Sequence, residues 1–261
     1  QRKQREDSDL PKVLIIGDLS TRLAALRSGK VDILSNVEWR DAEDVLKTNP
    51  SLVDSGGFPF TQPYVSFNCS TKPFDDVKVR RALLMAIDEP AIAKGLHKGN
   101  STICVSGMHP PGSILVPDMD ELPASTRELF QQNQEKSKQL LAEAGYPNGF
   151  KFTINIRSRD EPYASLAKAF WSQIGVRADI KVHESANFTS QQYGFKFPLW
   201  MDRWGFSWGN WSWVYEPMAH WNWSRITDPT LSGLITEATT NYVDWDKWVK
   251  DWRAICTRVT D

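Results

Sequence analysis

One short stretch of the chain, residues 198–224, gathers the side chains best suited to binding chemistry. Seven of the twelve tryptophans lie between Trp200 and Trp223, and Asp202 and Arg203 lie side by side among them. The planar guanidinium of an arginine recognises anions through two parallel hydrogen bonds. Indole rings present large flat apolar faces. The stretch therefore indicates recognition of a ligand.

Two interpretations of these side chains remain open from the sequence. Arg203 either meets an anionic group of a ligand, or it stacks on Trp204 or Trp208 and pairs with Asp202. The tryptophans of the stretch either line a cleft or pack in the core, where large aromatic side chains commonly lie.

The chain lacks several motifs of enzymes and metal sites. It contains no HExxH and no GxxxxGK[ST] sequence. His183-Glu184 has no further ligand at metal-binding spacing, and His109 is expected in an exposed loop. The three cysteines, Cys69, Cys104 and Cys256, form no CxxC pair, and we expect buried thiols rather than one disulfide plus a thiol. The sequence predicts a protein that is not an enzyme and that uses no cofactor and no metal.

The composition narrows the class of protein further. With 31 basic and 32 acidic residues, the net charge of −1 gives no field that attracts nucleic acid, so we expect no nucleic-acid partner. No run of about 18 apolar residues is present to cross a bilayer. The opening residues, QRKQREDSD, are too polar for a signal peptide. With 41% hydrophobic residues, the 261-residue chain can form one large domain or two smaller ones.

The segment from Lys72 to Leu96 predicts two consecutive helices. Asp75 or Asp76 caps the first helix, and Asp88 followed by Pro90 begins the second. The first helix carries an apolar stripe at helical spacing, formed by Val79, Ala82, Leu83, Ala86 and Ile87. Its basic residues are expected on a solvated face, and they are Lys78, Arg80 and Arg81.

Alternating apolar and polar residues predict strands at 150–157 and 176–182. Between them, Leu166, Phe170 and Ile174 have the spacing of one helix face. A strand, a helix and a strand in this order predict a parallel crossover and hence an α/β core.

A smaller unit of the same kind is predicted near the start of the chain. Its strands are expected at 13–16 and 31–34, around a helix that Ser20 caps and Gly29 ends. Further along, the proline-rich residues 99–124 predict an irregular excursion over the surface.

Three more helices are predicted in the later parts of the chain. One runs from about residue 133 to 144, and another is opened by Asp228 and Pro229. The last places three tryptophans on one packed face, and they are Trp245, Trp248 and Trp252.

Four segments, in order, resemble the extracytoplasmic solute-binding proteins of family 5. They are RLAALRSGKVDIL (22–34), FNCSTKPFDDVKVRRALLMAIDEPAIAKGL (67–96), KSKQLLAEAGYPNGFKFTINI (136–156) and AFWSQIGVRADIKV (169–182). Members of this family are receptors for oligopeptides, dipeptides, nickel and some oligosaccharides, and they feed ABC importers. The resemblance extends over nearly the whole chain and implies the substrate-binding component of such an importer.

The resemblance also implies the fold and the partners. The fold is an α/β lobe of the periplasmic-binding-protein type II, cluster C, with a mixed sheet flanked by helices. Family members are longer than this chain, so residues 1–58 are expected to be a remnant of the first lobe and hinge. Residues 59–261 are then the second ligand-binding lobe, truncated at its C-terminal return. The implied partners are a small solute, a peptide or an oligosaccharide, and the membrane permease. We expect a monomer in the periplasm or outside the cell. The full-length protein is expected there either free or held by a lipid anchor.

Residues 198–224 are similar to the family's segment in which a strand that ends in an x-Gly-aromatic signature, here Gly205-Phe206, is followed by a loop at the ligand cleft. In peptide-binding members an aspartate there pairs with the peptide's amino terminus, and the matching position is Gly209. Without that carboxylate a neutral or anionic ligand is favoured, unless Asp202 or Glu216 substitutes. The indole rings then favour an oligosaccharide-like solute over a free peptide. The predicted ligand-binding residues are Arg203, Trp204, Trp208, Gly209, Asn210, Trp211 and Trp213.

A stand-alone carbohydrate-binding module is the alternative, with residues 200–223 as its binding surface. Such modules are usually compact all-β domains, and the helical patterns in this chain oppose that interpretation.

Overall fold

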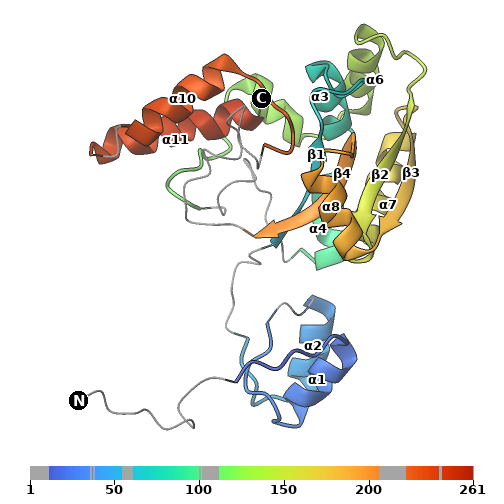
Figure 1. Ribbon diagram of the computed structural model, residues 1–261, viewed down its shortest axis with the longest axis vertical. Coiled ribbons are helices and arrows are strands. Elements are labelled where there is room, and N and C mark those ends of the chain that lie inside the picture. Colours follow the sequence, from blue (N-terminus) through green and yellow to red (C-terminus); the bar gives the residue numbers. More distant parts are fainter. Residues whose placement is uncertain are drawn as a thin grey trace. The chain divides into compact units, whose positions relative to one another are not determined.

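The computed structural model describes residues 12–35, 37, 39–54, 61–99, 101, 112–205, 222–240 and 243–260 (Figure 1). The chain forms two compact units, Gln1–Gly57 and Phe58–Asp261. Among the described helices, none combines the length and the hydrophobicity that crossing a membrane requires.

The described part of the first unit contains two helices, α1 (Leu19–Arg27) and α2 (Trp39–Thr48). Asp18, not Ser20, caps α1, because its carboxylate accepts a hydrogen bond from the Thr21 amide. Gly29 follows α1 with φ +69°, a conformation that glycine adopts without strain.

The strands predicted at 13–16 and 31–34 are wrong. The described residues of both segments have no strand structure, and Ile15 is 98% exposed. An apolar run becomes a strand only when another strand satisfies its backbone groups, and no such partner lies in the described part of this unit. The helix α2 was not predicted.

The second unit is built on a mixed sheet of four described strands in the order β1-β4-β2-β3. They are β1 (Thr61–Phe67), β2 (Lys151–Arg157), β3 (Arg177–His183) and β4 (Leu199–Gly205). β2 pairs in parallel with β3 and β4, whereas β1 is antiparallel to β4. The helix α7 (Glu161–Ser172) connects β2 to β3. The α/β fold with a mixed sheet is therefore confirmed.

Helices cover both faces of this sheet (Figure 1). One face packs against α3 (Val77–Met85), α6 (Gln134–Glu143) and α7, with α4 (Glu89–His97) at its margin. The other face packs against α8 (Ser185–Tyr193). Three short helices complete this part: α5 (Ala124–Arg127), η2 (Glu128–Phe130) and η3 (Ser158–Asp160).

The apolar core lies on the α3 and α7 face. Asp76 caps α3, and the predicted stripe is buried at Val79, Ala82, Leu83 and Ala86. The Trp171 indole N–H donates to the Leu83 carbonyl oxygen at 2.8 Å, which joins α7 to α3. Both the stripe and its cap are confirmed.

The basic side chains of α3 are less solvated than predicted. Arg80 donates to the Phe74 carbonyl oxygen at 2.8 Å, and Arg81 donates to the Ser125 carbonyl oxygen at 2.7 Å and to Glu128 at 3.1 Å. Arg80 thus ties α3 to the turn before it, and Arg81 ties α3 to the short helices α5 and η2. In α7, the buried residues are Tyr163, Ala164, Ala167 and Trp171 rather than the predicted Leu166 and Phe170.

Two glycines allow the loops before β2 and β3 to touch. A Cβ on Gly149 would lie 2.0 Å from the Gly175 carbonyl oxygen. Both residues have positive φ, +71° and +83°. The close backbone approach therefore requires glycine at position 149.

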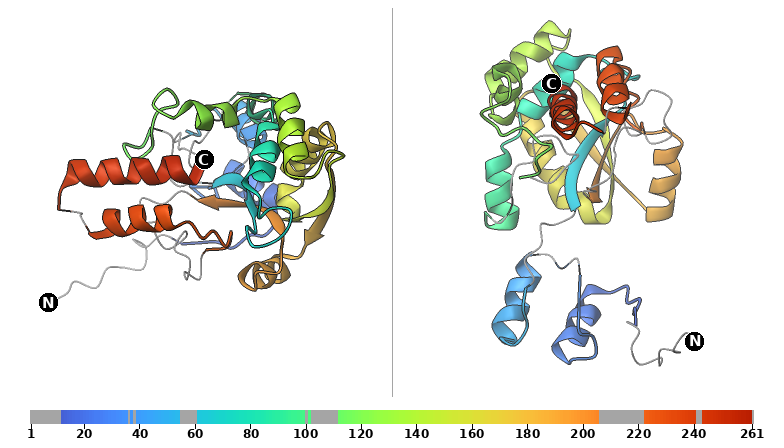
Figure 2. Two further views of the ribbon diagram at one scale, coloured as in Figure 1. Left: turned by 90° about the horizontal axis from the view of Figure 1, so that it is seen from above. Right: turned by 90° about the vertical axis from the view of Figure 1, so that its left-hand side faces the viewer.

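A helical hairpin, α10 (Pro229–Thr240) and α11 (Trp245–Thr260), closes the chain, and Figure 2 shows the two helices side by side. Asp228 accepts hydrogen bonds from the Thr230 and Leu231 amides, as its predicted capping position requires. Trp252 is buried, but Trp245 is 58% exposed and stacks on Trp248 at 5.1 Å. The prediction that Trp245 packs is therefore wrong, since it begins α11 at the connected end of the hairpin, past the last residue of α10.

The described part of the irregular passage, 112–123, contains neither helix nor strand, as predicted. It does not lie wholly on the surface, because Leu115, Val116 and Leu122 are buried, with Leu115 packed against the hairpin. Cys256 is a buried thiol and Cys69 a partly buried one, and Cys104 lies outside the described residues.

Candidate functional site

Strand directions bring several chain segments to one edge of the sheet. β2, β3 and β4 end at this carboxyl edge, and the antiparallel β1 begins there, with Thr61 opposite Gly205. Ligands of α/β proteins commonly bind beyond the carboxyl ends of parallel strands. We therefore take this edge as the candidate site.

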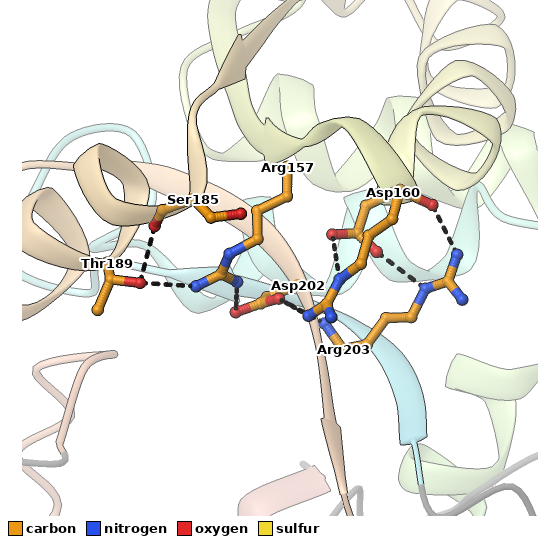
Figure 3. Close-up of polar contacts among 7 residues, drawn as sticks. Arg157, Asp160, Ser185, Thr189, Asp202 and Arg203 are labelled. Carbon is orange, nitrogen blue, oxygen red and sulfur yellow. Dashed lines mark hydrogen bonds and ion pairs between the residues drawn. The ribbon is translucent and has the colours of Figure 1, made fainter. Parts of the chain in front are cut away.

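A buried aspartate holds the first part of the site together. Asp202, on β4, forms an ion pair with Arg157, the last residue of β2 (Figure 3). It also accepts from Nη2 of Arg159 at 2.9 Å and from the Arg203 amide at 2.8 Å. Because the Asp202 carboxylate is removed from water, these charged donors are what makes its burial tolerable.

A second buried carboxylate, Asp160, extends the network. Its Oδ1 accepts from Nε of Arg203 at 2.9 Å, and its Oδ2 lies 3.6 Å from Nε of Arg159. Burial raises the pKa of Asp160, while the charges of Arg159 and Arg203 act in the opposite direction. Asp160 is thus held by two arginines in a place that disfavours its charge.

Both ends of the arginine network rest on aromatic rings. The Arg203 guanidinium lies 5.0 Å from the centre of the Tyr163 ring, and that of Arg157 lies 4.2 Å from the Phe188 ring. Arg157 also donates to Oγ1 of Thr189 at 3.0 Å, which links the site to α8 (Figure 3). These contacts fix two of the three guanidinium groups.

The α8 face beside this network is polar and buried. The Asn155 side chain donates to the Leu199 carbonyl oxygen at 2.9 Å, and its Oδ1 lies 2.9 Å from Nε2 of His183. Burial lowers the pKa of His183, and the charge of Lys181 acts in the same direction. Glu184 caps α8 by accepting from the Ala186 amide at 2.9 Å.

Within the part of the chain that the structure describes, no three His, Cys, Asp or Glu residues are grouped to hold a metal ion. The neighbours His183 and Glu184 have separate structural partners, Asn155 and the start of α8.

The described residues of the network carry more positive than negative charge. Three guanidinium groups face two carboxylates, a surplus of one positive charge among these residues. The Arg159 side chain is 53% exposed, whereas those of Arg157 and Arg203 are 16% exposed. Arg159 is therefore the group that an anion in solvent can reach.

Among the described residues, the Arg203 side chain pairs with Asp160, whereas the predicted ion pair was with Asp202. It lies over the Tyr163 ring. Its Nη2 also donates to the Arg159 carbonyl oxygen at 2.6 Å. The predicted contacts with a ligand anion and with Trp204 or Trp208 stay predictions. The predicted role of Asp202 as partner of a ligand ammonium is opposed by its two arginine partners.

Most other predicted site residues lie outside what is described. Trp204 is part of β4, opposite Gln62, and nothing is described of its side chain. The remaining predicted residues lie outside the described ranges and stay predictions: Trp208, Gly209, Asn210, Trp211, Trp213 and Glu216.

Sequence reasoning missed Arg157, Arg159 and Asp160. A signal was present, since the charged run RSRD, residues 157–160, directly follows a strongly predicted strand. Polar residues at a strand's carboxyl end mark candidate sites in α/β folds.

Sequence reasoning also missed that GFSWG, residues 205–209, has the GxSxG spacing of a hydrolase nucleophile elbow. Such an elbow turns from a strand into a helix, and β4 does end at Gly205. The rest of the segment lies outside the described residues.

The family follows from a direct comparison. A profile described as "Bacterial extracellular solute-binding proteins, family 5 Middle" matches residues 10–225. The chain belongs to this family. Its members bind solutes, so the prediction of a protein that is not an enzyme is confirmed, and the GxSxG spacing carries no hydrolase assignment.

Relatives and solved structures agree with this family. Heme-binding protein A of Haemophilus influenzae is 34% identical over 195 residues, which cover 71% of this chain and 34% of that protein. The glutathione-binding protein GsiB of Shigella flexneri is 27% identical over 83% of this chain and 41% of its own length. The chain therefore spans less than half of these relatives.

Two solved structures share the fold. HbpA2 from Haemophilus parasuis has a TM-score of 0.72 and 27% identity, covering 94% of this chain and 49% of that one. The oligopeptide-binding protein AppA from Bacillus subtilis, in complex with a nonapeptide, has a TM-score of 0.79 and 20% identity, covering 94% and 51%.

Proposed function

We propose that this chain is a ligand-binding lobe of the substrate-binding component of an ABC importer, and that its solute carries a carboxylate. The observation that carries the proposal is the surplus positive charge at the carboxyl edge, with Arg159 exposed. A ligand carboxylate would balance that charge.

The relatives support the choice of solute. Their names and titles give heme, glutathione and a nonapeptide as ligands. Heme, glutathione and unmodified peptides differ in shape, but all carry carboxylates. A guanidinium recognises the group they share, and the rest of the cleft would select among them.

The lobe would supply one side of the binding site. Receptors of this kind enclose the solute between two lobes that close about a hinge. We propose that residues 1–58 are the remnant of the first lobe and hinge and 59–261 the second lobe, and that this chain alone binds weakly. The full-length protein would work as a monomer outside the cytoplasmic membrane, lipid-anchored or free, and deliver its solute to the permease.

A thermal-shift screen of the full-length protein tests the proposal, because a ligand that binds only the folded state raises the melting midpoint. The screen pairs glutathione and a tripeptide with their carboxyl-amidated forms, and it adds heme and a set of oligosaccharides. We expect stabilisation by one of the carboxylate ligands and at least a tenfold weaker affinity for its amide.

A matched pair of variants locates the effect. Arg159→Gln should weaken binding of the carboxylate ligand about tenfold and leave the affinity for its amide unchanged, since only the free acid pairs with the guanidinium. Arg177→Gln removes an exposed arginine from the opposite end of the sheet, at the start of β3, and should change neither. Equal affinity for acid and amide would contradict the proposed carboxylate.

An oligosaccharide-like solute remains the second candidate, and it rests on the tryptophans of residues 200–223 and on Gly209. In the full-length protein, Trp208→Ala should then weaken sugar binding without lowering stability. Stabilisation by carboxylate ligands alone, unaffected by Trp208→Ala, would exclude the sugar.

A further inference from the structure

A hollow of about 410 Å³ lies at the amino end of β2, where residues 72–74 and 196–198 also line it. Its lining includes Phe74 and Phe152 of the apolar core as well as Gln191 of α8. On β2 the lining runs from Lys151 to Asn155, whereas the arginine network begins at Arg157. The charged residues of that network are absent from the described lining, so the hollow and the network are neighbouring but separate places.

Four lysines from four segments line this hollow: Lys72, Lys151, Lys181 and Lys196. No acidic side chain is among its lining residues. Lys151 pairs with Asp179 at 2.8 Å, outside the lining. In the described ranges of the chain, no ion pair joins Lys72, Lys181 or Lys196 to a carboxylate. The hollow is therefore a concentration of positive charge in which three of the four lysines have no ion-pair partner among the described residues.

The interior of the hollow offers hydrogen bonds beside this charge. Thr153 of β2 and Gln191 of α8 contribute polar side chains, and Phe152 and Phe197 contribute apolar surface. The Asn155 side chain also lines the hollow, but it is already bonded to Leu199 and His183. The volume lies within the range of about 300 to 1,000 Å³ that is usual for small-molecule sites. Concave shape, donors and unbalanced charge occur together here.

We infer that this lysine hollow binds a small molecule with two or more negative charges, of the phosphate-ester class. An ammonium acts as a compact point charge, which suits the tetrahedral oxygens of a phosphate group. A single negative charge would leave two of the three unpaired lysines, Lys72, Lys181 and Lys196, unbalanced. The polar and apolar side chains that line the hollow would contact the uncharged remainder of the molecule.

Titration calorimetry of the chain with inorganic pyrophosphate at low salt tests the inference. We expect binding that weakens as salt is added, because screening reduces exposed charge interactions. Amide NMR signals of Thr153, Asn155 and Gln191 should shift on addition. Absence of binding, or shifts confined to the Arg157 to Asp160 segment, would overturn the inference.

A double variant with a matched control locates the site. Lys181→Gln with Lys196→Gln should reduce the affinity for pyrophosphate at least tenfold and leave the melting temperature unchanged, because both side chains are exposed. Lys94→Gln with Lys250→Gln removes the same charge from exposed positions on α4 and α11 and should have no effect. Equal loss in both double variants would show an unspecific charge effect and overturn the site.

Vesicles distinguish two sources of the phosphate group. Cosedimentation with phosphatidylglycerol vesicles, lost in the Lys181/Lys196 variant and absent with phosphatidylcholine, would identify a lipid headgroup. Binding of pyrophosphate without cosedimentation would identify a soluble phosphate ester. Arg159→Gln should change neither result, which separates this test from that of the carboxylate solute.

Discussion

The two faces of the sheet in the second unit have opposite contents, although the same strands form both. On β2, Ile154 and Ile156 enter the apolar core with α3 and α7, while Asn155 and Arg157 enter the polar network with α8. The first face is held by close packing of apolar surface. The second combines charged hydrogen bonds around the buried Asp202 carboxylate with an aromatic cluster that includes Phe188, Phe197 and Trp200. One face thus provides stability through packing alone, and the other adds charge arranged for recognition.

The apolar face should be the more sensitive of the two. Leu83→Asp should unfold the second unit, since an unpaired charge at this fully buried position costs about 5 kcal/mol or more, comparable with the stability of a typical domain. Circular dichroism and the melting temperature measure the effect. Val77→Asp, at an exposed position on the same helix, is the control and should melt like the wild type.

Substitutions on the polar face should also lower the free energy of unfolding, because each buried charge there depends on its ion-pair partner. Asp202→Ala should cost about 3 kcal/mol, since it leaves Arg157 buried without its carboxylate. Denaturant unfolding measures the loss. Asp202→Asn keeps the shape and part of the hydrogen bonding and should lose less. Wild-type stability of Asp202→Ala would show that the network does not hold the two strands together.

The contact between the loops that precede β2 and β3 should rank next. Gly149→Ala should cost about 2 kcal/mol, because a Cβ there meets the Gly175 carbonyl oxygen and the backbone has positive φ. Gly145→Ala is the matched control, with φ +91° and nothing within 4 Å of the added Cβ, and it should cost about 1 kcal/mol. Equal melting temperatures of the two variants would contradict the close approach.

The smallest expected effect is a pH dependence at the start of α8. Hydrogen bonds from the Ala186 and Asn187 amides lower the pKa of Glu184 below its ordinary value of 4.5. A carboxyl group with a lowered pKa in the folded state stabilises it above about pH 4.5 and loses that contribution as the pH falls through the lowered pKa. Glu184→Gln should therefore melt slightly below the wild type at pH 7. The difference should vanish at low pH, and a constant difference would contradict the capping role.

The sequence predicted elements wherever local signals and long-range packing agree. The caps Asp76 and Asp88, the α3 stripe and the alternation of β2 and β3 each survive in the structure. The strands predicted at 13–16 and 31–34 failed because their apolar runs find no partner strand among the described residues. The prediction that Trp245 is packed failed because a helical stripe predicts which residues share a face but not where the neighbouring helix ends.

The sequence by itself determined the family, the α/β class and the apolar side of the sheet, because periodicity and capping act over a few residues. The choice of ion-pair partners, in contrast, depends on the tertiary structure. Arg203 could have paired with its neighbour Asp202, but successive residues of a strand point to opposite faces, so Arg203 reaches Asp160 while Asp202 reaches Arg157. The lysine hollow likewise joins four segments that lie far apart in sequence. Their shared place depends on how the sheet and α8 pack.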